Sequence, residues 1–356
     1  MQTIGERFGF RSKPTITLGG EYVTGPVYVG IELEFSNIAR LDGSPLLWWS
    51  WHTDGSIRGE WPGELVLRAP THPRGLDTAL AEYRECVEQR VTINESCGVH
   101  VHVDVCDLTF DELRGVLLLY SVLERTLYKY CGSSRENNNF CVPLGECGDR
   151  LSWFRGGISI NNDLRYCGLN LAAVRKFGSI EFRMHPGCTD PIHIGAWAGI
   201  CARIKEYGRT CTPESIYNML YGSPGTFLTE TMGGHAGHLL PCVSTNDLLD
   251  GAREGKEIYY ATNLLGSEKR MISNRPRSKT KALYSPYDVW SSKAAPRTHP
   301  DPVRTETPLE YLLSAREYPP PPRRYPYYTT SDDDVALTID PESIVPLNRS
   351  DLEGEF

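Results

Sequence analysis

Three short stretches of this chain alternate apolar and polar residues with a period of two, which is the pattern of a β-strand with one buried face. They span residues 30–35, 97–104 and 179–185. The apolar positions are Ile31, Leu33, Phe35, Val99, Val101, Val103, Ile180, Phe182 and Met184. The polar positions between them are Glu32, Glu34, His100, His102, Asp104, Glu181, Arg183 and His185. Carboxylates, imidazoles and an arginine bind divalent metals and phosphate, so this face predicts a metal and phosphate site.

The sequence around these stretches predicts further elements of an α+β fold. Residues 27–70 predict a strand, a loop and a second strand at residues 64–68, and residues 75–90 predict a helix. Residues 131–163 are rich in Gly, Asn and Cys and predict a long loop. Because loops of that length in compact domains are usually functional or disordered, we expect a lid or a substrate-specificity element there.

Two longer helices carry start signals. The residues from Thr109 to Glu112 fit a capping box, and the apolar pattern that follows continues to Tyr130. Asp190 fits an N-cap and the proline after it fits the first helical position, which predicts a helix ending near Gly208.

Composition limits the class of protein. The chain has 356 residues, of which 40% are hydrophobic, enough for a substantial core in one large domain or two ordinary ones. The net charge of −8 argues against general nucleic-acid binding. The N-terminus lacks the pattern of a signal peptide, and the longest apolar run, Val116 to Tyr120, is too short to span a membrane. We therefore expect a cytoplasmic protein.

The chain contains 11 cysteines, and without a signal peptide an odd number favours reduced thiols over a disulfide framework. Cys131, Cys141 and Cys147 lie together in the predicted loop, but the chain has no Cys-x-x-Cys pair. The spacing therefore argues against structural zinc, and the sequence alone leaves metal binding at this loop open.

The composition changes at about residue 266, so we predict a catalytic domain over residues 1–265 and a tail over residues 266–356. Residues 269–281 contain six basic residues and no acid, and residues 296–326 contain nine prolines. Such a composition buries too little apolar surface to offset chain entropy, so we expect a largely disordered tail. Polyproline II segments in it would be able to dock a partner protein.

The order of the three motifs resembles the amidoligase family. The motifs are Gly-x-Glu-x-Glu, then Cys-Gly-x-His-Val-His-Val, then Ile-Glu-Phe-Arg, and the resemblance covers about residues 27–200. That family belongs to the ATP-dependent carboxylate–amine ligases, which share the fold of glutamine synthetase and glutamate–cysteine ligase. The resemblance implies a curved, mostly antiparallel sheet with helices on its outer face and a polar concave face toward ATP and metals.

The resemblance also implies roles for individual residues. Glu32, His100 and Glu181 resemble the ligands of the Mg²⁺ or Mn²⁺ ion that bridges the ATP phosphates. Glu34 resembles a ligand of a second ion next to the amino-acid substrate, and Asp54 and Glu64 match the acids that complete that second site in related ligases.

Four more residues are similar to family positions around the nucleotide. His102 resembles the second histidine of the family motif, which lies nearer the nucleotide. Arg183 matches the arginine on the transferring phosphoryl group, a role that suits a fixed and always charged fork. Arg165 and Asn170 precede the third motif as similar residues do in the family, and we assign them to substrate or phosphate contact.

Two other functions remain open from the residues alone. A metal-dependent hydrolase or nuclease would also use His-x-His with carboxylates, and an inactive ligase fold would serve as a binding or scaffold protein. Selectivity in this fold lies in variable loops, here residues 36–60 and 131–163, so the sequence does not identify the carboxylate or the amine. An amino acid, a peptide terminus, a cell-wall peptide, a protein side chain and a modified nucleobase all fit.

Overall fold

The computed structural model describes residues 2–10, 28–38, 46–132, 135, 138, 140–144 and 166–261. The tail predicted over residues 266–356, Cys147, Arg165 and much of the predicted loop over residues 131–163 lie outside these residues.

A six-stranded sheet forms the centre of the fold, and each neighbouring pair of its strands is antiparallel. Across the sheet, the order is β3 (Trp49–His52), β4 (Gly63–Leu67), β1 (Val29–Phe35), β6 (Gly98–Asp104), β8 (Ser179–Pro186) and β7 (Leu169–Asn170). The three alternating stretches of the sequence thus form three adjacent strands, β1, β6 and β8. A separate two-stranded ribbon pairs β2 (Asn37–Ile38) with β5 (Val91–Thr92).

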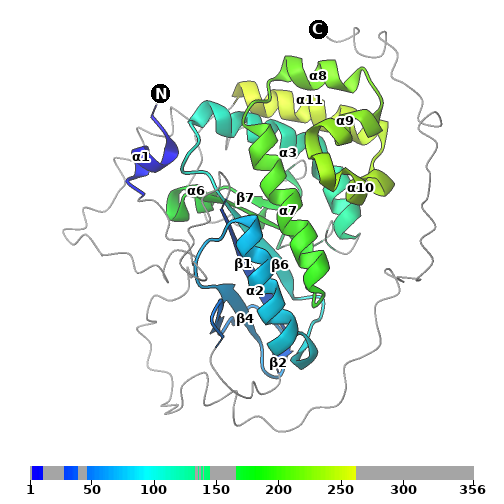
Figure 1. The fold of residues 1–356 in the computed structure, drawn as a ribbon. Coiled ribbons are helices and arrows are strands. Elements are labelled where there is room, and N and C mark those ends of the chain that lie inside the picture. Colours follow the sequence, from blue (N-terminus) through cyan, green and yellow to red (C-terminus); the bar gives the residue numbers. More distant parts are fainter. Residues whose placement is uncertain are drawn as a thin grey trace.

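Three helices cover one face of the sheet (Figure 1): α2 (Pro73–Cys86), α3 (Phe110–Cys131) and α7 (Pro191–Gly208). α7 contacts β1 and β6, and α3 contacts β8. The apolar residues of the three strands are buried in the core that these helices share with the sheet. This arrangement confirms the α+β class and the antiparallel sheet that the sequence predicts.

The sequence signals place the helix starts accurately. Thr109 accepts a hydrogen bond from the backbone N–H of Glu112, and the Glu112 carboxylate accepts one from the backbone N–H of Thr109, which completes the predicted capping box. Asp190 caps α7 through the backbone N–H of Ile192. The predicted helix over residues 75–90 is instead α2 followed by a short 3₁₀ helix, η1 (Glu88–Arg90).

The remaining helices are short or lie C-terminal to the sheet. They are α1 (Ile4–Phe8), α6 (Ala172–Phe177), α8 (Pro213–Leu220), α9 (Pro224–Met232), η4 (Gly233–His235), α10 (Ala236–Leu239), η5 (Leu240–Cys242) and α11 (Thr245–Ala261). The last long helix, α11, packs along α3, and α8 to α11 gather at one end of the molecule (Figure 1). Among the described helices, none combines the length and apolar character of a membrane span.

A β-bulge interrupts the pairing of β6 with β8. Val101 pairs with Phe182, whereas Val99 pairs with His185, so two residues of β8 lie opposite His100 alone. A bulge of this kind shifts the alternation of the strand that carries the extra residue.

The bulge corrects one prediction. Simple alternation places His185 on the polar face with Glu181 and Arg183, but its ring lies 5.4 Å from the ring of Trp197 in α7 and 6.3 Å from that of Tyr130 in α3. His185 therefore packs against the helices on the opposite face. Burial is the main cause that lowers its pKa to about 4, although a hydrogen bond to the Pro186 carbonyl acts in the other direction.

Candidate metal and phosphate site

Three adjacent strands each contribute one buried side chain to a first group of possible metal ligands, which we call cluster A: Glu32 of β1, His102 of β6 and Glu181 of β8. Their ligand atoms lie within 4.8 Å of one another. The Nε2 atom of His102 is 3.5 Å from Oε1 of Glu32 and 4.0 Å from Oε2 of Glu181. The pairing explains this position, since His102 lies directly opposite Glu181 between neighbouring strands.

A second group, cluster B, consists of Glu34, Asp54 and Glu64, whose ligand atoms also lie within 4.8 Å of one another. Glu34 of β1 and Glu64 of β4 are cross-strand partners. Asp54 comes from the loop between β3 and β4, where its Oδ1 atom accepts hydrogen bonds of 2.8 Å from the backbone N–H and the hydroxyl of Ser56. All three carboxylates are buried.

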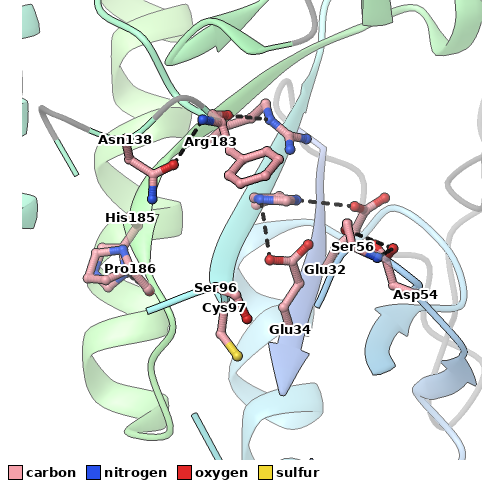
Figure 2. Close-up of polar contacts among 12 residues, drawn as sticks. Glu32, Glu34, Asp54, Ser56, Ser96, Cys97, Asn138, Arg183, His185 and Pro186 are labelled. Carbon is pink, nitrogen blue, oxygen red and sulfur yellow. Dashed lines mark hydrogen bonds and ion pairs between the residues drawn. The ribbon is translucent and has the colours of Figure 1, made fainter. Parts of the chain in front are cut away.

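His100 lies between the two clusters. Its Nδ1 atom is 3.5 Å from Oε2 of Glu32 and 3.7 Å from Oε1 of Glu181, and its Nε2 atom is 3.9 Å from Oε2 of Glu34. Figure 2 shows Glu32 and Glu34 on the same strand with their carboxylates directed toward this part of the site. The ring therefore faces cluster A with one nitrogen and cluster B with the other.

Two polar neighbours fix Glu181. The guanidinium of Arg183 forms an ion pair with Oε1 of Glu181, and Nδ2 of Asn170 donates a 2.6 Å hydrogen bond to Oε2. Arg183 also reaches the carbonyl of Phe140, at 3.4 Å from its Nε (Figure 2). Both oxygens of Glu181 thus have a fixed orientation.

The charges in this site are stable at neutral pH. Burial by itself raises the pKa of the Glu32 carboxyl, but hydrogen bonds from His100 and His102 hold this pKa well below its usual range. Burial also raises the pKa of Glu181, and here the positive charge of Arg183, followed by the charges of the histidines, lowers it overall. The Glu181 carboxylate in turn outweighs burial and raises the pKa of Arg183. Glu32 and Glu181 are therefore ionised and Arg183 is charged.

The donor atoms suit a hard divalent ion. Around Mg²⁺ in an octahedron with bonds of about 2.1 Å, adjacent ligand atoms lie about 3.0 Å apart and opposite ones about 4.2 Å apart. The distances of 3.5 Å and 4.0 Å in cluster A fall between these values. In cluster B the ligand atoms lie within 4.8 Å of one another, which is close to the separation of opposite ligands around such an ion. Carboxylates with few imidazoles favour Mg²⁺ or Mn²⁺ over softer metals.

The strand pairing brings together nearly all residues that the sequence predicts for the site. These are Glu32, Glu34, Asp54, Glu64, His100, His102, Asn170, Glu181 and Arg183. Arg165 lies outside the described residues. The sequence assigns His100 to the ion of cluster A, and in the structure its Nδ1 atom lies as close to Glu32 and Glu181 as Nε2 of His102 does.

Sequence reasoning misses two residues beside the site. The hydroxyl of Ser179 lies 3.1 Å from Nδ1 of His102 and orients that ring. Ser179 shares the alternation of Glu181 and Arg183, so the strand pattern contained a signal for it.

Arg135 is the second, and no periodic pattern marks it. Its buried guanidinium donates to the carbonyl of Arg183 at 2.8 Å and to that of Met184 at 3.3 Å, both at the bulge. A side chain at position 98 would crowd the Arg135 guanidinium, because a Cβ on Gly98 would lie 3.3 Å from Nη2 of Arg135.

The fold and site define a class: an α+β protein with two buried acidic clusters and an arginine on one antiparallel sheet. Within that class, residues 85–151 match the model of a family described as "Putative amidoligase enzyme", which confirms the resemblance predicted from the motifs. The matched range contains β6 with both histidines, and α3. The description of the family indicates a ligase. Comparison with curated proteins gives no match.

Proposed function

We propose that this protein is an ATP-dependent ligase that joins a carboxylate to an amine. The observation that carries the proposal is the pair of acidic clusters on adjacent strands, with Arg183 beside cluster A and His100 between the two. The proposal includes the glutamine synthetase-like fold, to which the antiparallel sheet with helices on one face is suited, and a cytoplasmic location, where ATP and Mg²⁺ are abundant.

The chemistry follows from the poor reactivity of a carboxylate toward amines. One carboxylate oxygen attacks the γ-phosphorus of ATP and the bond to the β,γ-bridging oxygen breaks, which gives an acyl phosphate and ADP. The amine then attacks the acyl carbon, inorganic phosphate leaves with the C–O bond electrons, and the amine loses a proton. The products are an amide, ADP and phosphate.

Each cluster has a separate part in this proposal. Glu32, His102 and Glu181, together with His100, would hold an ion at the ATP phosphates. Cluster B would hold a second ion next to the carboxylate substrate, with Asp54 as its loop ligand. When bound, Mg²⁺ or Mn²⁺ neutralises negative charge on the phosphates and on the transferring group.

The remaining residues orient these groups. Arg183 would stabilise charge on the transferring phosphoryl group, because its fork is planar and permanently charged. Asn170 holds Glu181 in place through its amide hydrogen bond. An amino acid, a peptide or a protein side chain would supply the carboxylate and the amine.

A calorimetric titration of ATP tests the metal-bridged site. We expect appreciable ATP binding with Mg²⁺ or Mn²⁺ and little with EDTA, because buried carboxylates repel the bare phosphates. Glu181→Gln should weaken the binding of Mg·ATP, whereas Glu257→Gln, at an exposed position of α11, should leave it unchanged. Equal ATP affinity with and without metal would rule out this model, and substrate turnover without ATP would indicate a hydrolase instead.

A further inference from the structure

The position of His100 links the two clusters physically. Its side chain is buried, and its two nitrogens point in different directions, Nδ1 toward Glu32 and Glu181 and Nε2 toward Glu34.

The contact between His100 and Glu34 is the part of this link that reaches cluster B. Among the described residues, His100 is the one ion-pair partner that the structure gives to Glu34. Gly98 keeps the space between them open, since a Cβ at that position would lie 2.9 Å from Nε2 of His100 and 3.3 Å from Oε2 of Glu34. The glycine therefore allows the imidazole and the carboxylate to face each other.

The chemistry of imidazole determines which atom would donate a hydrogen bond in this contact. A nitrogen that binds a metal carries no proton, so the other nitrogen carries the N–H and can donate it to a carboxylate. If Nδ1 of His100 is a ligand of the ion in cluster A, the proton is on Nε2, and this N–H points toward Glu34. A donated hydrogen bond would then fix the carboxylate of Glu34 in one orientation, which lowers the cost of ordering it as a ligand in cluster B.

We propose that His100 couples the two metal sites, so that an ion in cluster A raises the affinity of cluster B for a second ion. The proposal rests on the proposed function only in taking both clusters as metal sites. Linkage requires the effect to be reciprocal, so cluster B also raises the affinity of cluster A by the same factor. Without such coupling, two divalent ions in neighbouring sites would repel each other and therefore bind with negative cooperativity. Positive cooperativity is therefore the distinctive result.

The test is a titration of the full-length, metal-free protein with Mn²⁺ in the absence of ATP, followed by the electron paramagnetic resonance signal of free Mn²⁺. We expect two bound ions, with about a tenfold increase in affinity for the second, and a spin-coupled signal from the pair. This readout needs no substrate and no activity.

Two conservative variants each remove one side of the imidazole bridge. His100→Asn keeps a polar atom near the position of Nδ1 but loses the reach to Glu34, and His100→Gln keeps a polar atom near Nε2 instead. Both should still bind Mn²⁺, but without positive cooperativity. His193→Asn, at a half-exposed histidine of α7 outside both clusters, is the control and should keep the wild-type cooperativity.

Each outcome distinguishes the two proposals. Two ions that bind to the wild type independently or with negative cooperativity would overturn the coupling and leave the metal sites of the proposed function standing. The absence of any Mn²⁺ binding would overturn the metal sites themselves. Cooperativity that persists in both His100 variants, folded as judged by their melting temperatures, would remove His100 from the coupling.

Discussion

Glu181 and Arg183 are near neighbours on one strand, form an ion pair, and still differ in their proposed roles. Glu181 belongs to cluster A and touches Arg183 and Asn170. Arg183 is part of neither cluster and carries the one permanent positive charge that pairs with them among the described residues. Glu181 is proposed as a metal ligand and Arg183 as a contact of the transferring phosphoryl group. Substitutions at the two positions should therefore have different effects.

We expect Arg183→Lys to lower turnover more than ATP affinity. Lysine keeps the charge but loses the bidentate fork, and a lost transition-state contact of this kind costs about 3 kcal/mol, or about a hundredfold in rate. Glu181→Gln should instead weaken Mg·ATP binding itself. The measurement is ADP release with a working substrate pair, together with an ATP titration of each variant. Wild-type turnover of Arg183→Lys would leave Arg183 as a structural ion-pair partner only.

The strand pattern predicted most of this site, and its failures have local causes. Alternation places Glu32, Glu34, His100 and His102 correctly, because β1 and β6 are regular up to the bulge. The same rule fails at His185, since an extra residue on β8 shifts the strand. Pairing in the sheet then decides which predicted ligands meet, and no pattern along the chain states that His102 lies opposite Glu181.

At the scale of elements, the bulge between β6 and β8 is held by a side chain from outside the sheet. Bulges leave backbone groups of the ladder without their usual partners. Arg135 donates to two carbonyls of β8 at this point, from a segment that follows the end of α3. The sequence predicts a loop over residues 131–163, but Arg135 itself is helical, and the prediction did not reveal that its side chain is buried against the strand.

Arg135→Met should therefore lower the free energy of unfolding by about 2–4 kcal/mol, because two buried carbonyls lose charged donors. Urea unfolding followed by circular dichroism measures the loss. The control is Arg253→Met, which replaces an exposed arginine of α11 that pairs with Asp250 and should change stability by less than about 0.5 kcal/mol. A loss at Arg135 no larger than that of the control would show that the bulge is stable without it.

At the scale of the whole molecule, His185 links acid stability to the contact between sheet and helices. It is buried between β8 and the helices α3 and α7, with a pKa of about 4. In the unfolded chain, the pKa of a histidine is about 6.5. The unfolded state therefore binds the proton first as pH falls, so the stability from neutral His185 is full above pH 6.5 and is lost toward pH 4.

We expect the wild type to lose about 2 kcal/mol of unfolding free energy between pH 7.5 and pH 5 through this residue. His185→Gln should lower stability at pH 7.5 but show a smaller loss on acidification, because glutamine does not titrate. Urea unfolding of both proteins at the two pH values gives the comparison. The same pH dependence in both would assign the acid sensitivity to other groups.

The sheet order has a consequence for how the protein is made. β1 and β6 are neighbours in space but are separated in sequence by α2, and β6 and β8 are separated by α3. Closing these long segments costs chain entropy before the pairing repays it, so such contacts form slowly. During synthesis, cluster B can assemble once β4 has emerged, but cluster A has no third ligand until the ribosome has passed Glu181. At a synthesis rate of about 5–20 residues per second, β6 therefore waits several seconds for β8, and its unpaired edge and apolar face make the nascent domain prone to aggregation.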